Sequence, residues 1–169
     1  MGWRFDDAEG MYDIAQICLN GHITNDSTQQ FPQGSKKFCP NCGAATTIAC
    51  PTCGHPIRGD YISDVVVVMG HHYKAPAYCE NCGTPYPWTD KTKAAAAQLA
   101  KQLPGLTESE KSEITDSIDD LVVETPKSKP AALKLKQLLA KAGGEAAGML
   151  RDLVVDVSSE AVKKVLLGP

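Results

Sequence analysis

The sequence predicts a small α+β protein, in which a cysteine-rich module of short β-hairpins precedes an all-α region of about four helices. Two observations predict this division. All seven cysteines and all four histidines lie before Trp88, and every aromatic residue lies at or before it. The remainder is rich in Ala, Leu and Lys. We therefore predict two domains, residues 1–88 and 89–169, a number that the chain length allows.

Seven cysteines and one histidine form four close pairs in the first domain. The pairs are Cys18/His22, Cys39/Cys42, Cys50/Cys53 and Cys79/Cys82. Four pairs supply two sets of four ligands, the number that closed tetrahedral zinc sites use. A disulfide framework would leave one of the seven cysteines over, whereas in two metal sites His22 serves as the eighth ligand. We predict two structural Zn²⁺ ions held by these eight residues.

The turns around the pairs suit a metal. Residues 39–43 and 50–54 read CPxCG, and residues 79–83 read CENCG. Proline favours a tight turn, and glycine takes the positive φ that other residues resist. A redox-active Cys-x-x-Cys is the alternative, but it expects a single motif on a βαβ pattern. Three such motifs in one short stretch favour structural metal.

The pairing of the four turns is open between two arrangements. In the sequential one, the first two pairs hold one ion and the last two hold the other, so that each half is a zinc ribbon of β-hairpins. In the cross-braced one, found in RING-like domains, the pairs alternate between ions. We favour two sequential ribbons because each half then forms a compact hairpin unit without interleaving.

We do not expect the remaining histidines and the acidic residues of the first domain to be metal ligands or catalytic groups. We interpret His55 as a turn residue, because the four-cysteine set beside it is complete. His71 and His72 follow a strand-like run, Val65–Met69, and fit a hairpin tip better than a third site. The aspartates and glutamates here are interpreted as surface or turn residues, and they comprise Asp6, Asp7, Glu9, Asp60 and Asp64.

Four helices are predicted in the second domain from capping signals and apolar periodicity. The first runs from Thr89, as N-cap, through Leu103. The second follows the capping box Thr107–Glu110, runs to about Glu124 and buries four apolar side chains, Ile114, Ile118, Leu121 and Val122. The third covers about 130–142, and the fourth about 145–167. The fourth carries a wide apolar stripe, part of which is available for a partner or a second copy.

The charge pattern argues against nucleic-acid binding by the first domain. Up to Thr92 the chain has six Lys or Arg against nine Asp or Glu, and the net charge of the whole chain is −3. Phosphate binding needs clustered basic residues. The predicted third helix is basic and the second is acidic, so we expect these helices to pack together and offset each other's charge.

Four segments carry a family resemblance. Residues 12–22 read YDIAQICLNGH, 36–44 read KKFCPNCGA, 56–59 read PIRG and 82–89 read CGTPYPWT. In these motifs the chain resembles an uncharacterised bacterial family with an N-terminal double zinc ribbon and a helical C-terminal region. The resemblance covers roughly residues 10–90 well and the helices loosely. It implies zinc binding in a bacterial cytoplasm and supplies no catalytic residue.

The sequence thus favours a non-enzymatic adaptor or regulatory protein over the alternatives. Both ligand sets are complete, whereas a catalytic zinc keeps one position open. No set of nucleophile, base and orienting residue stands out. We expect the protein to act through a protein partner or self-association of its C-terminal helices. The alternative is a nucleic-acid-binding zinc-ribbon regulator. No apolar stretch is long enough to span a bilayer and no secretory signal is visible, so we expect a cytoplasmic protein.

Overall fold

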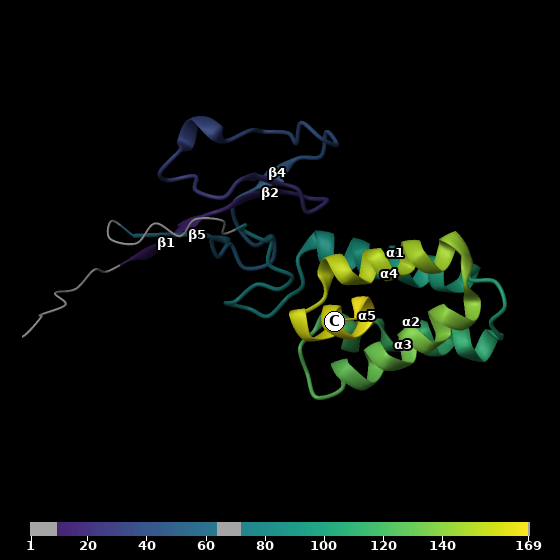
Figure 1. Cartoon of the computed structure of the whole chain (residues 1–169). Coiled ribbons are helices and arrows are strands. Elements are labelled where there is room, and N and C mark those ends of the chain that lie inside the picture. The colour runs from purple at the N-terminus through teal and green to yellow at the C-terminus, as the bar shows by residue number, and fades with distance from the viewer. Residues whose placement is uncertain (1–9, 64–71, 169) are drawn as a thin grey trace, which may run out of the picture. The chain divides into compact units, whose positions relative to one another are not determined.

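The computed structural model describes residues 10–63 and 72–168 of the chain. It divides into two compact units, Met1–Trp88 and Thr89–Pro169. The first holds short antiparallel strands in two sheets and the second holds helices, so the α+β class is confirmed (Figure 1). The expected 65–69 strand, His71 and the acidic residues Asp6, Asp7, Glu9 and Asp64 lie outside the described residues.

Five strands and a short 3-10 helix make up the described part of the first unit. They are β1 (Met11–Ile14), β2 (Gln16–Cys18), β3 (Ile23–Asn25), η1 (Pro32–Gly34), β4 (Thr46–Thr47) and β5 (Arg58–Ile62). One sheet has the order β3-β2-β4, and the other pairs β1 with β5, all antiparallel. Strands this short bury little apolar surface, so other interactions must hold the unit together.

The β1–β5 sheet corrects the expectation that the two halves form separate hairpin units. β1 precedes the first pair of ligands and β5 follows the third, yet Tyr12 lies opposite Tyr61. The Ala15 N–H also donates to the Ile57 carbonyl at 2.8 Å. The chain therefore interleaves the two halves. Gly59 marks a close crossing of backbones, because a Cβ there would lie 2.3 Å from the Asp26 carbonyl oxygen.

A small core of described residues joins the two halves. Its buried members are Ala15, Ile17, Cys50, Ile57, Cys79, Tyr86 and Trp88. Tyr86 stacks on Trp88 with ring centroids 4.6 Å apart, and the Trp88 Nε1–H donates to the Pro76 carbonyl at 2.8 Å. A Cβ on Gly21 would lie 3.0 Å from the Cβ of Trp88, so this indole also packs on the turn that precedes His22.

Five helices form the described part of the second unit, one more than predicted. They are α1 (Pro87–Gln102), α2 (Glu108–Val122), α3 (Ser128–Ala142), α4 (Gly144–Val157) and α5 (Glu160–Leu167). The first helix begins at Pro87, a residue type favoured at a first helical position, and Thr89 lies inside it rather than at its cap. None of the described helices is long and apolar enough to cross a membrane.

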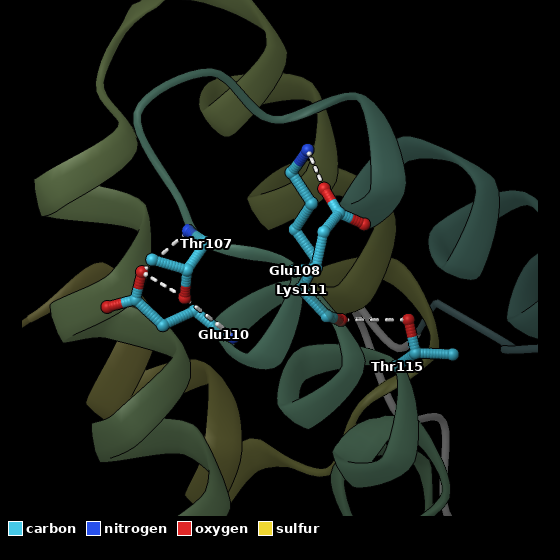
Figure 2. A network of polar contacts seen from close by, with 5 residues as sticks. All are labelled: Thr107, Glu108, Glu110, Lys111 and Thr115. Carbon is cyan, nitrogen blue, oxygen red and sulfur yellow. Dashed lines mark hydrogen bonds and ion pairs between the residues drawn. The ribbon is translucent and has the colours of Figure 1, made fainter.

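The start of α2 follows the predicted capping box. The Glu110 N–H donates to the Thr107 Oγ1 at 3.3 Å, and the Thr107 N–H donates to Glu110 Oε2 at 2.9 Å (Figure 2). The four expected side chains of α2 are buried. The charge complementarity with α3 is confirmed, because Lys134 pairs with Glu113 and Lys141 pairs with Glu110.

The predicted last helix is interrupted at Ser158 and Ser159. The Ser158 Oγ donates to the Val154 carbonyl at 2.6 Å, and Ser159 takes an extended conformation as the N-cap of α5. Serine hydroxyls compete for backbone groups in this way and end or bend helices. The break folds α5, labelled in Figure 1, onto α3. Much of the apolar stripe is thereby buried, with Leu150, Val154, Val162 and Leu166 in the core.

Candidate metal centre

Three ligand pairs lie in turns with the same backbone hydrogen bonds. In the first of these turns, the Cys39 N–H donates to the Ala44 carbonyl and the Gly43 N–H donates to the Cys39 carbonyl, both at 2.8 Å. The 50–55 and 79–84 turns repeat both bonds within 0.1 Å. The glycine of each turn has φ between 70° and 73°, as the sequence predicts. This geometry aims two cysteine sulfurs to one side of each turn.

The remaining turn, residues 18–22, also presents two ligands, but its glycine and its second ligand are spaced differently. Its glycine, Gly21, comes one position earlier and has φ 90°, and its N–H donates to the Cys18 carbonyl. The second ligand, His22, therefore comes one position later than the second cysteine of the other turns. The longer imidazole presents Nδ1, which lies 3.6 Å from the sulfurs of both Cys18 and Cys39.

The structure brings the eight candidate ligands together in two clusters. One contains Cys18, His22, Cys39 and Cys42, and the other contains Cys50, Cys53, Cys79 and Cys82. Within each cluster the four candidate ligand atoms all lie within 4.8 Å of one another. The grouping is the sequential one, although the strands around it interleave.

The distances between ligand atoms fit one tetrahedral ion in each cluster. Two thiolates about 2.3 Å from a shared ion lie about 3.8 Å apart, and a thiolate and an imidazole nitrogen about 3.6 Å apart. The observed sulfur–sulfur distances are 3.8 Å for Cys18–Cys42, 3.8 Å for Cys50–Cys82 and 3.7 Å for Cys53–Cys79. A disulfide would need about 2.05 Å. The clusters thus have the spacing of metal sites.

Each turn contributes one buried and one exposed ligand. Cys18, Cys39, Cys50 and Cys79 are buried, whereas the second ligand of each pair is exposed. At two of the exposed cysteines, Cys42 and Cys82, backbone and side-chain donors stabilise the thiolate, the form that binds metal. The Ala44 N–H and the Asn20 amide lower the pKa of the Cys42 thiol to about 6. The Thr84 hydroxyl and N–H likewise lower the pKa of Cys82 to about 6.

Two asparagines beside the clusters were not identified from the sequence. The Asn20 side-chain amide lies 3.4 Å from the Cys42 sulfur, and the Asn81 amide lies 3.6 Å from the Cys53 sulfur. Each asparagine sits two positions after the first ligand of its own turn and reaches a sulfur of the opposite turn. Such donors orient ligands and tune metal affinity. This shared position in the sequence could have marked both asparagines as candidate donors, but it does not predict which cysteine sulfur each one contacts.

His55 lies outside both clusters. Its carbonyl accepts the Cys50 N–H, and its Nε2 lies 3.5 Å from the Glu80 carboxylate. Arg58 lies 3.3 Å from the other oxygen of Glu80 and 4.8 Å above the Tyr12 ring. The turn interpretation of His55 is consistent with these contacts, which tie the 50–55 turn to the 79–84 turn across the second cluster.

Comparison with known proteins gives one family. A family described as "Uncharacterized protein conserved in bacteria (DUF2321)" matches residues 11–166, most of the chain. No curated protein and no solved structure matches. The family description names no activity, ligand or partner, so any functional inference depends on the geometry above.

Proposed function

The chain belongs to this uncharacterised bacterial family, and we propose that it is a non-enzymatic adaptor with two structural Zn²⁺ ions that acts through protein contacts. Zinc suits the donor sets, three thiolates with one imidazole and four thiolates, since soft sulfur ligands at tetrahedral spacing favour it over hard cations. Reduced thiols of this kind fit a bacterial cytoplasm.

The completeness of both ligand sets carries the proposal. A catalytic zinc holds three protein ligands and leaves a position for water or substrate. Here each cluster offers four side chains with mutually close ligand atoms. An ion bound by all four has no open position, so its contribution is folding free energy rather than chemistry.

The proposed contact surface lies on the C-terminal helices. Met149 on α4 is 54% exposed and Leu167 on α5 is 58% exposed, although both are large apolar side chains. Val165, which lies on the wide apolar stripe predicted for the last helix, is half-buried, and its carbonyl accepts a hydrogen bond from the Lys136 ammonium. Met149 and Leu167 are therefore better anchors for a partner than Val165.

Metal analysis of the purified chain tests the zinc assignment. We expect two zinc ions per chain, and one in Cys42→Ser, because that change removes one ligand from the first cluster and none from the second. One ion or none in the unchanged protein would contradict the two-site proposal. Bound iron in place of zinc would contradict the assignment of the metal as zinc.

Affinity capture from the native host tests the adaptor assignment. A partner that binds the zinc-loaded chain should be lost from a Met149→Asp/Leu167→Asp variant and retained by Phe38→Asp, which changes an exposed apolar residue of the first unit. The reverse pattern would place the contact surface on the first unit. Recovery of nucleic acid in a salt-sensitive complex would contradict the adaptor role and favour the regulator.

A further inference from the structure

The helical unit contains a pocket that the adaptor role does not use. It has a volume of about 330 Å³ and lies among α3, α4 and α5. Its apolar lining includes Leu139, Ala147 and Leu166. Ligand pockets commonly begin at about 300 Å³ and combine an apolar lining with a few polar groups. This pocket therefore has the size for a small molecule.

Two cations, Lys136 and Arg151, also line the pocket. Both side chains are exposed, so they lie at its mouth rather than in its floor. The Lys136 ammonium donates to the Val165 carbonyl at 2.8 Å, and the Arg151 guanidinium contacts Asp152 through Nε and Nη2. Lysine has three donors and arginine has five, so these contacts leave donors for a ligand. None of the residues that line the pocket is acidic.

Gly148, a residue inside α4, also lines the pocket. A Cβ at this position would meet no heavy atom within 4 Å, so close packing does not require glycine. Glycine inside a helix is less stable than alanine. The position therefore gives up helix stability without a packing reason, and a larger side chain there tests whether the open space beside it is the ligand site.

We propose that this pocket binds a small organic monoanion with an apolar body, of the class of a medium-chain carboxylate. The apolar lining takes the body, and Lys136 and Arg151 take the carboxylate at the mouth. Guanidinium and ammonium groups form charge-assisted hydrogen bonds with carboxylates, and arginine can do so with two parallel bonds. This binding function does not depend on the adaptor role.

Titration of the zinc-loaded full chain with octanoate, followed by amide NMR, tests the site. Octanoate should shift the amide signals of Gly143, Gly144 and Gly148, which line the pocket. Octylamine, with the same apolar body and a positive charge, should bind at least about tenfold more weakly. The absence of saturable shifts with millimolar octanoate, or equal binding of octylamine, would overturn the proposal.

Three variants locate the site. Gly148→Leu should weaken octanoate binding at least about tenfold without lowering the melting temperature, because leucine is a better helix former and enters open space. Arg151→Gln should weaken the binding of octanoate but not the binding of octanol, which carries no charge. Lys129→Gln, on α3 but outside the pocket lining, is the control and should bind octanoate normally. Unchanged octanoate affinity in Gly148→Leu would overturn the proposal.

Discussion

The two units of this protein fold by different means. Among the described residues, the first unit buries nine apolar residues, and four of them are candidate metal ligands. The helical unit buries sixteen, none of them cysteine. A small unit with so few buried side chains needs a further source of stability, which the proposed metal ions would supply. The helical unit has a conventional core of leucine, isoleucine, valine and alanine.

Metal removal should show the largest difference between the units. Structural zinc contributes about 10–16 kcal/mol to folding in small zinc-binding peptides. A strong chelator should therefore unfold the first unit and leave the helical unit folded. Amide NMR of the full chain can follow both units at once. Dispersed signals from the first unit after chelation would show that its strands and small core are sufficient to keep it folded without metal.

A core substitution in α3 should reverse the asymmetry. Leu135 is 1% exposed, so Leu135→Ala should destabilise the helical unit by about 2–5 kcal/mol, through lost apolar burial and the cavity left behind. The zinc content should remain at two. Leu133→Ala, two positions away and 54% exposed, is the matched control and should change little. Zinc loss in Leu135→Ala would show that the units do not fold independently.

An added methyl group can sharpen the comparison. Gly59→Ala places a Cβ against the Asp26 carbonyl oxygen and backbone atoms of the 13–15 segment, where the two halves interleave. We expect the first unit to lose about 1–3 kcal/mol, as in other overpacked sites. Gly148→Ala, in open space on α4, should instead stabilise the helical unit by about 0.5–1 kcal/mol. Denaturant unfolding measured separately for each unit distinguishes these outcomes. No change in the unfolding free energy of Gly59→Ala would mean that the backbones at this crossing shift to accept the methyl group.

Local features of both units could be predicted from the sequence, as could the grouping of the ligand pairs and the charge pairing of α2 with α3. The pairing of distant strands and the targets of single side chains could not. The turns that hold the ligand pairs and the Thr107 capping box depend on residues a few positions apart, so the spacing of those residues is sufficient to predict them. The β1–β5 pairing joins strands more than forty residues apart, and no local pattern encodes such a register. The targets of Asn20 and Asn81 depend on which turns meet. The break at Ser158 was missed because the apolar periodicity continues across it.

The smallest expected destabilisation concerns the cap of α2, which separates local helix energetics from core packing. Thr107→Ala removes the hydroxyl that accepts the Glu110 N–H and should cost the helical unit about 1 kcal/mol. Thr115→Ala is the matched control in the same helix. Its hydroxyl donates to the Lys111 carbonyl, which already belongs to the helix, and alanine has the higher helix propensity. This control should therefore be neutral or slightly stabilising in thermal unfolding of the helical unit. Equal destabilisation by both changes would mean that the threonine methyl groups matter through packing and that the capping box (Figure 2) contributes little.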